Sequence, residues 1–219
     1  MARLSFSLEG MKTSESHLKT FFERVKGESS FGEPASTVQR VPDLLSPGTV
    51  LDLGAGDGRH ALYLASHGFQ VRAVDASPSA LEKLKALAAE KELSIETELA
   101  DAARYTIDKR YDVVIVALLF QCLDEESSLR LLKQIQGQTQ PGGINVIHVF
   151  TKTGDRYRLD QTEDPGAFYP DDGWLSQQYK DWALIEFNSS SSPLIGKFNE
   201  DGSPMMSVVE RVIARKRDV

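Results

Sequence analysis

Two spacings of apolar residues alternate along the central part of the chain. Strands are expected at residues 50–53, 70–75, 94–101, 111–120 and 141–150, and the continuous apolar run at 111–120 is typical of a strand buried on both faces. Segments with the spacing of amphipathic helices lie between them, at residues 59–69, 76–93 and 124–140. Strands that alternate with helices predict an α/β fold, with a doubly wound, mostly parallel sheet that helices cover on both faces.

The pattern changes on both sides of this core. Residues 9–26 have loose helical spacing, and residues 36–45 are expected to form a short helix despite Pro42. Residues 151–173 are polar and rich in turn signals, which indicates a long loop or lid. Two alternating apolar runs around "NEDGS" predict an antiparallel hairpin at the sheet edge, and the serines at 189–192 are expected to form a flexible turn.

Net charge and cysteine content limit the classes of partner and the cellular compartment that we expect for this protein. The formal net charge is −7 and the pI is near 5.2, so no basic stripe is expected to bind a nucleic-acid backbone. No segment reaches the ~20 apolar residues of a membrane span, and the N-terminus has no signal-peptide core. The single cysteine, Cys122, cannot form an internal disulfide. We therefore predict a cytoplasmic protein that binds neither nucleic acid nor a membrane. The short additions outside the core, about fifty residues at the start and the segment 151–173, favour a small molecule over a macromolecule as its partner.

The stretch "VLDLGAGDGRH", residues 50–60, has three glycines directly behind an apolar strand. A strand, a glycine-rich turn and a helix gather backbone N–H groups and the positive end of the helix at one point, where the polar part of a ligand can bind. The dinucleotide fingerprint requires a third glycine where this chain has Arg59. This departure favours a smaller ligand, with a ribose and a separate charged end, over a dinucleotide.

Two acidic residues follow neighbouring strands of the predicted sheet. Asp75 ends the second strand, where a carboxylate can accept both hydroxyls of a ribose, and Asp101 follows the third strand, within reach of an adenine edge. Taken singly, each also suits a helix cap or a solvated loop charge. Together with the glycine turn, they lie at the carboxyl ends of successive strands, where open α/β sheets bind their ligands. The sequence therefore predicts a nucleoside site at this edge.

These segments resemble a known family. The stretch "VLDLGAGDGRHALYLASHGFQVRAVDASPSAL", followed by "YDVVIVALLFQCL" and "LLKQIQGQTQPGGINVI", is similar to the motifs of class I S-adenosylmethionine-dependent methyltransferases over about residues 50–147. The resemblance implies that the glycine turn surrounds the methionine part of the cofactor, that Asp75 holds the ribose and that Asp101 meets the adenine. The implied cofactor-binding residues are Gly54, Ala55, Gly56, Gly58, Arg59, Asp75, Ala76, Asp101, Ala102 and Ala117.

The domain organisation follows from length and from this resemblance. A chain of 219 residues suits one large α/β domain with a sizeable core. Within that single domain, residues 1–48 are expected to form a helical lead-in and residues 49–150 the cofactor-binding core. Residues 151–219 are expected to form the lid and the edge hairpin.

Within this superfamily, the chain is most similar to the tellurite-resistance methyltransferases of the TehB type. The similar segments are "GDGRHALYLASHGFQVRAVD", "INVI" after "PGG", and the end "ARK" after an "NEDGSPMMSVVERVI" hairpin. The resemblance implies methylation of soft oxyanions of tellurium and selenium. Where that family tends to place a His-Arg pair before the last hairpin, this chain reads "LIGKF", in which Lys197 is the only cation. The departure leaves the tellurite substrate open and does not affect the cofactor.

Methyl transfer from a sulfonium is an in-line displacement that depends on positioning and desolvation, so it requires no obligatory catalytic residue. An anionic acceptor needs a cation to hold it, and a neutral acceptor needs a base. The acceptor-side candidates are His148, Arg156, Arg158 and Lys197. The alternatives are a hydrogen-bonded core histidine and solvated loop charges. The four histidines are too scattered along the chain to indicate a metal site.

Three functions remain open on the sequence alone. We favour transfer of a methyl group from S-adenosylmethionine to a small molecule, such as a soft oxyanion or a thiol. One alternative is a protein that binds the nucleoside without turnover. The other is an NAD(P)-dependent oxidoreductase on the same kind of sheet, which Arg59 in place of the third glycine disfavours.

Overall fold

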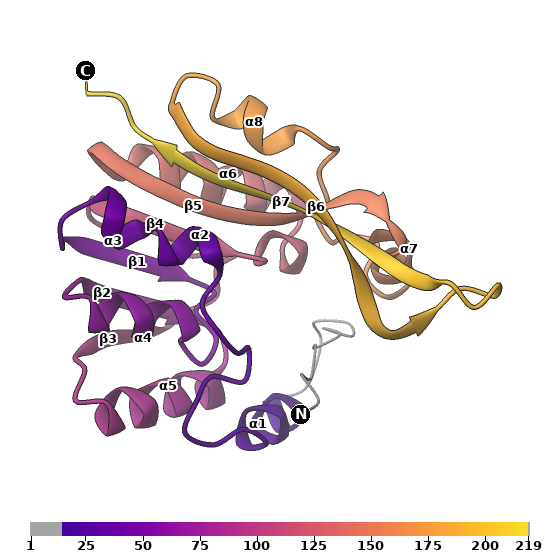
Figure 1. Cartoon of the computed structure of the whole chain (residues 1–219), viewed down its shortest axis with the longest axis horizontal. Coiled ribbons are helices and arrows are strands. Elements are labelled where there is room, and N and C mark those ends of the chain that lie inside the picture. The colour runs from indigo at the N-terminus through magenta and orange to yellow at the C-terminus, as the bar shows by residue number, and fades with distance from the viewer. Residues whose placement is uncertain (1–14, 219) are drawn as a thin grey trace.

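The computed structural model describes residues 15–218 of the chain. Its centre is a seven-stranded sheet with the strand order β3-β2-β1-β4-β5-β7-β6 (Figure 1). The strands are β1 (Thr49–Leu53), β2 (Gln70–Asp75), β3 (Ile95–Leu99), β4 (Tyr111–Ala117), β5 (Thr139–Gly154), β6 (Ala183–Phe198) and β7 (Pro204–Arg215). The first five pair in parallel, whereas β7 is antiparallel to both β5 and β6. The predicted α/β fold with an edge hairpin is confirmed.

Helices cover both faces of this sheet (Figure 1). Along the chain they are α1 (Glu15–Glu23), α2 (Ser36–Gln39), α3 (Val41–Leu44), α4 (Arg59–Ser66), α5 (Pro78–Glu90), the 3-10 turn η1 (Phe120–Cys122), α6 (Glu125–Gly137), α7 (Asp155–Glu163) and α8 (Trp174–Gln178). Side chains of a strand alternate between the two faces. Leu51 and Leu53 therefore join the core under α6, whereas Val50 joins the core under α4 and α5.

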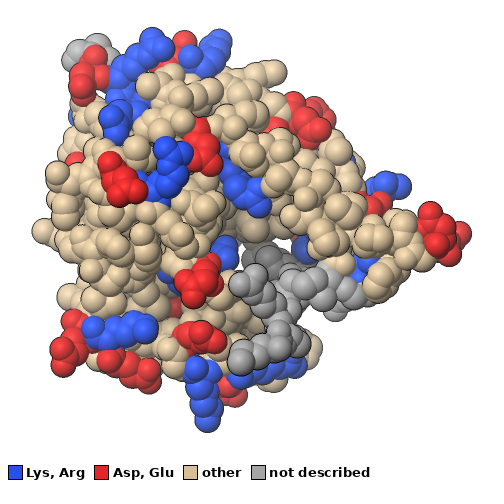
Figure 2. Space-filling view, in the orientation of Figure 1, with Lys and Arg blue, Asp and Glu red and all other residues tan. Residues whose placement is uncertain are grey.

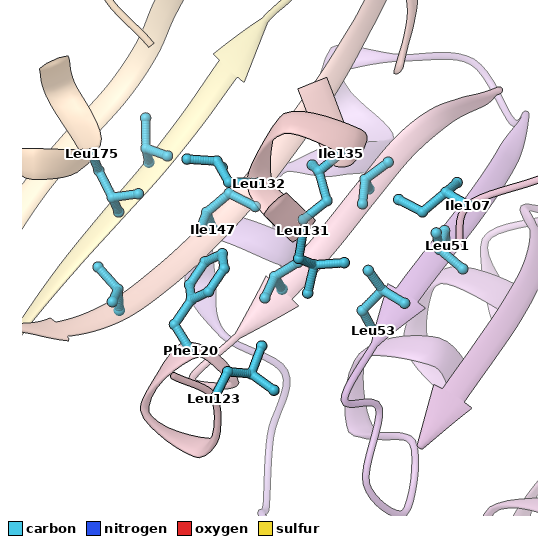
Figure 3. Packing of buried hydrophobic residues seen from close by; sticks show 14 of the residues in the cluster. Leu51, Leu53, Ile107, Phe120, Leu123, Leu131, Leu132, Ile135, Ile147 and Leu175 are labelled. Carbon is cyan, nitrogen blue, oxygen red and sulfur yellow. The ribbon is translucent and has the colours of Figure 1, made fainter. Parts of the chain in front are cut away.

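The core under α6 runs without interruption from β1 to β7. Figure 3 shows Leu53 of β1, Ile147 of β5 and Leu131 of α6 within one cluster of buried side chains, and all three are fully buried. Burying a leucine or isoleucine side chain contributes roughly 1.5–3 kcal/mol relative to leaving it exposed. This packing holds the carboxyl ends of the parallel strands at fixed positions relative to one another.

The polar segment 151–173 is not the predicted long loop. Strand β5 continues to Gly154, and α7 and α8 follow, so that the loop is confined to the residues between the two helices. Helix α7 has no apolar stripe, which is why hydrophobic periodicity did not predict it. Instead, an ion pair between Arg156 Nε and Asp160 Oδ2, at 2.7 Å, joins successive turns of the helix.

The predicted flexible turn at residues 189–192 is wrong. These serines lie within β6 and pair in antiparallel register with residues 207–210 of β7. The hydrogen bonds of a strand pair come from the backbone, so a run of small polar side chains can continue a strand when its partner is well anchored. Strand β7 is anchored in this way, because Val209 and Val212 are buried in the core.

The helices before the sheet are shorter than predicted. The helix expected at residues 9–26 is α1, which begins at Glu15, and residues 9–14 lie outside the described residues. The helix expected at residues 36–45 is divided at Arg40 into α2 and α3. Pro42 lies in the first turn of α3, where its missing N–H group is not needed.

Within residues 15–218, no helix is both long enough and apolar enough to cross a bilayer. On the face that Figure 2 shows, acidic and basic side chains occur in small groups between larger uncharged areas.

Candidate functional site

The glycine turn joins β1 to α4 in a conformation that side chains disfavour. Gly54, Gly56 and Gly58 have positive φ angles of 71°, 57° and 87°, and such left-handed conformations cost other residues roughly 1–2 kcal/mol each. The N–H groups of Gly54 and Ala55 both donate to the carbonyl oxygen of Val74, at 2.8 and 3.1 Å. These bonds tie the turn to the end of β2 and form a cradle lined by backbone.

Asp75, the last residue of β2, is bonded to this cradle. Its Oδ2 accepts the N–H of Gly56 at 2.8 Å, and its Oδ1 accepts the N–H of Ser77 at 2.9 Å. Burial raises the pKa of this carboxyl, and the backbone N–H groups oppose the increase. The structure therefore brings Asp75, the residue predicted to bind a ribose, into direct contact with the glycine turn.

The other predicted cofactor residues follow the neighbouring strands. Ala76 is exposed directly after β2, and Ala117 is half-buried at the end of β4. Asp101 is exposed after β3, and its Oδ1 accepts the N–H of Ala103 at 2.9 Å, so the carboxylate also closes its own turn. Ala102 packs against the core under α6. All four lie at the edge formed by the carboxyl ends of the parallel strands, and their contacts with a cofactor stay predictions.

The connection after β4 is strained. Leu118 has a φ angle of 58°, which is rare for a bulky side chain, and residues strained in this way cluster at functional sites. The next side chain, that of Leu119, lies against the glycine turn, because a Cβ atom added at Gly54 would be 3.0 Å from Leu119 Cδ1. The end of β4 thus closes one side of the cradle.

Asp52 is a buried acid that the sequence-based site does not include. It lies in β1 two residues before Gly54, with 1% of its surface exposed, and among the described residues its Oδ2 has no hydrogen-bond partner. Burial raises the pKa of this carboxyl to about 7, and the nearby Arg59 guanidinium opposes the increase. The signal in the sequence was an aspartate within an apolar strand, two residues before the first glycine of the turn.

Replacing Asp52 with asparagine should increase stability at pH 8 and flatten its dependence on pH. The carboxyl ionises near its ordinary pKa of 3.8 in the unfolded chain and near 7 in the folded one, so unfolding releases a proton between these values. Wild-type stability should therefore fall by a few kcal/mol as pH rises from about 4 to 7. Urea unfolding at several pH values measures both slopes, and equal slopes in the two proteins would contradict the assignment.

His148 of β5 lies near polar side chains from three other elements, namely Thr37 of α2, Arg59 of α4 and Arg211 of β7. It is 2% exposed, and its Nε2 is 2.7 Å from Thr37 Oγ1 of α2. Burial lowers the pKa of this imidazole to about 3, and the guanidinium groups of Arg211 and Arg59 lower it further. The ring is therefore neutral at physiological pH. Thr37 and Arg211 belong to no motif, and sequence reasoning missed them because only the fold places them beside His148.

Arg156 of α7 is buried although its helix is polar. Its Nε donates to Asp160 Oδ2, which also accepts the hydroxyl of Tyr169, and its guanidinium lies 5.4 Å from the centre of the Phe150 ring. Burial raises the pKa of the Cys122 thiol, the charge of Asp75 raises it further, and that of Arg156 opposes the increase. Cys122 therefore lies within the electrostatic reach of both the Asp75 carboxylate and Arg156 of α7.

The other two acceptor-side candidates, Arg158 and Lys197, are not buried as His148 and Arg156 are. Arg158 has 77% of its side chain exposed and forms an ion pair with Asp155 at 2.8 Å. Lys197 lies one residue before the end of β6, in the hairpin that projects from the body of the molecule (Figure 1). Of the four candidates, His148 and Arg156 are the buried ones. Among residues 15–218, no three His, Cys, Asp or Glu side chains are grouped in a way that could hold a metal ion.

Known proteins resemble the chain in sequence. The family model described as tellurite resistance protein TehB matches residues 21–205. The probable S-adenosyl-L-methionine-dependent methyltransferase TehB of Haemophilus influenzae (strain 10810) is 30% identical over 174 residues, which cover 80% of this chain and 59% of that protein. The chain thus spans less than two thirds of the length of this relative.

Solved structures resemble the chain in fold. The crystal structure of TehB from Haemophilus influenzae superposes with a TM-score of 0.74 at 26% identity, and the match covers 91% of this chain and 67% of that one. The N-methyltransferase NodS from Bradyrhizobium japonicum WM9, in complex with S-adenosyl-L-homocysteine, superposes with a TM-score of 0.63 and covers 93% of this chain and 98% of its own. At 15% identity, this second likeness bears on the fold alone.

Proposed function

The chain belongs to the TehB family and has the class I methyltransferase fold, and on this premise we propose that it transfers a methyl group from S-adenosylmethionine to a small anionic acceptor. The observation that carries the proposal is the Asp75 carboxylate, which two backbone N–H groups hold beside a cradle of glycines. When bound, the cofactor would supply an electrophilic methyl group, and the protein would position the acceptor in line with it.

The residues at the cradle fit the parts of this cofactor. Asp75 supplies acceptor oxygens for the ribose hydroxyls. Arg59, mostly buried at the start of α4, suits the carboxylate of the methionine part. Asp52 is buried with an unpartnered oxygen among the described atoms, which suits an ammonium group. A side chain at Gly54 would press against Leu119 and one at Gly56 against Phe31, so the turn can keep this shape only with glycines at these positions.

Cationic side chains support an anionic acceptor, such as a soft oxyanion or a thiolate. Arg211 is half-buried beside His148, and within the described part of the chain no carboxylate forms an ion pair with it. Its Nη1 donates to Ser190 Oγ at 2.5 Å. Partial burial strengthens the attraction between a cation and an anion, because less water screens the charges. Arg211 therefore offers an anionic acceptor a partly buried positive charge beside His148.

The first experiment is isothermal titration with S-adenosylhomocysteine, with NADH and NADPH as parallel ligands. We expect saturable binding of S-adenosylhomocysteine and none of the nicotinamide nucleotides. Binding of a nicotinamide nucleotide alone would overturn the proposal in favour of an oxidoreductase. A panel of tellurite, selenite and thiols then tests turnover, and tight cofactor binding without methylation of any acceptor would favour a binding protein.

Replacing Arg211 with glutamine should raise the KM for an anionic acceptor by about tenfold or more, since a hydrogen bond to a charged group contributes about 1.5–3 kcal/mol. The affinity for S-adenosylhomocysteine should stay unchanged. The matched control is Arg40→Gln, which removes an arginine that is paired with Glu186 and nearly half exposed. Initial rates over a range of acceptor concentrations measure the effect. Equal KM values in Arg211→Gln and Arg40→Gln would contradict this role.

A further inference from the structure

Residues 15–31, here called the N-terminal flap, comprise α1 and the segment that follows it. Helix α1 lies beside α5 (Figure 1). Glu15 at its start accepts the N–H of Ser79 at 2.9 Å and the hydroxyl of Ser77 at 3.2 Å. Ser77 and Ser79 closely follow Asp75 in the chain, so this end of the flap is attached next to the proposed ribose ligand.

The other end of the flap is attached to the glycine turn through Asp57. This carboxylate is fully buried. It accepts the hydroxyl of Ser29 at 2.5 Å and the N–H of Ser30 at 2.6 Å. Lys83 Nζ of α5 lies 3.1 Å from Asp57 Oδ2 and donates to Ser30 Oγ at 2.7 Å. A buried carboxylate between two glycines of the turn thus binds backbone and side chain of the flap.

These bonds place Phe31 over the cradle. A Cβ atom added at Gly56 would lie 2.7 Å from Phe31 Cε2, so the ring is in contact with the turn. The carbonyl oxygen of Phe31 accepts Arg59 Nη1 at 3.2 Å. On its other side the ring packs against Phe21 and Phe22 of α1, with centroid distances of 5.5 and 6.0 Å. The flap and the cradle therefore form one packed unit.

We propose that the flap closes the cofactor site and that Asp57 is the positioning residue that holds it closed. The inference rests on the proposed function, because it assigns the cradle to S-adenosylmethionine. A cofactor that enters or leaves the cradle must pass Phe31, and the flap can move aside only when its bonds to Asp57 break. These bonds, together with the bond of Arg59 to the carbonyl oxygen of Phe31, then slow the release of the cofactor.

The test compares wild type with Asp57→Asn and Phe31→Ala. Asparagine keeps the shape of Asp57 but loses its charge and one acceptor oxygen, whereas alanine at Phe31 leaves Asp57 and the turn intact. Stopped-flow displacement measures the dissociation rate of S-adenosylhomocysteine, and hydrogen exchange of a peptide containing Ser30 and Phe31 measures flap opening. We expect both variants to release the ligand about ten- to a hundredfold faster, and Asp57→Asn to exchange the Ser30 amide faster even without ligand.

Asp108→Asn is the matched control. This exposed aspartate pairs with Arg72 at 3.1 Å and lies just before the start of β4, whereas the cradle lies at the carboxyl ends of the strands. It should leave both readouts unchanged. If Asp57→Asn does not fold, Phe31→Ala still decides the outcome. Normal dissociation rates in the folded variants would overturn the flap's role while leaving the proposed function intact. If wild type binds no S-adenosylhomocysteine, the proposed function is wrong and the flap's role falls with it.

Discussion

Replacing Asp75 with alanine should weaken the binding of S-adenosylhomocysteine by about a hundredfold. The carboxylate is partly buried and already oriented by the N–H groups of Gly56 and Ser77. Binding a ribose would therefore cost little reorganisation of this side chain. Each hydrogen bond to a charged group contributes about 1.5–3 kcal/mol, and about 1.4 kcal/mol corresponds to a tenfold change in affinity. Isothermal titration measures the change directly.

The same substitution removes two acceptors from backbone N–H groups, so a loss of stability must be separated from a loss of affinity. Asp75→Asn retains the shape and one acceptor oxygen and should have an intermediate affinity. Asp108→Ala removes an exposed aspartate just before the start of β4, away from the carboxyl ends of the strands, and this variant should bind S-adenosylhomocysteine normally. Urea unfolding shows whether each variant is folded at the titration temperature. An unchanged affinity in folded Asp75→Ala would exclude Asp75 as the ribose ligand.

Replacing Gly58 with alanine should lower the free energy of unfolding by about 3 kcal/mol. Two costs add. The left-handed backbone at a φ angle of 87° disfavours a Cβ atom by roughly 1–2 kcal/mol. The added atom would also lie 2.1 Å from Leu84 Cδ1, and Leu84 is fully buried, so it must move within a packed core at a cost of about 1–3 kcal/mol. Urea denaturation measures the sum.

Two further variants separate these costs. Gly202 has a similar φ angle of 81° and no atom within 4 Å of an added Cβ, so Gly202→Ala should show the backbone cost alone. In a Leu84→Ala background, the space left by the leucine should accept the new methyl group, and Gly58→Ala should then cost less than in wild type. If Gly58→Ala costs no more than Gly202→Ala, the proposed contact with Leu84 is absent.

The fold could be predicted from the sequence because short segments of the chain show by their own apolar pattern which element they form. The buried strands β1, β2 and β4 are short apolar runs, and the helices between them have apolar stripes that face the sheet. Hydrophobic burial therefore decides which of these segments are strands and which are helices, and so the order of the elements along the chain. Helix α7 and the serines of β6 escaped prediction because neither presents an apolar pattern. Their conformations depend on an ion pair and on backbone pairing with β7.

The proposed site divides in the same way. By itself, the sequence determined the sheet, the glycine turn and the position of Asp75, because a strand end, a turn and the next strand end follow within about 25 residues. Only the tertiary structure decided which distant residues complete the site. Thr37 and His148 are 111 positions apart and meet at 2.7 Å, and Ser29 meets Asp57 across 28 positions. These side chains carry no periodic signal, since their partners are chosen by the packing of whole elements.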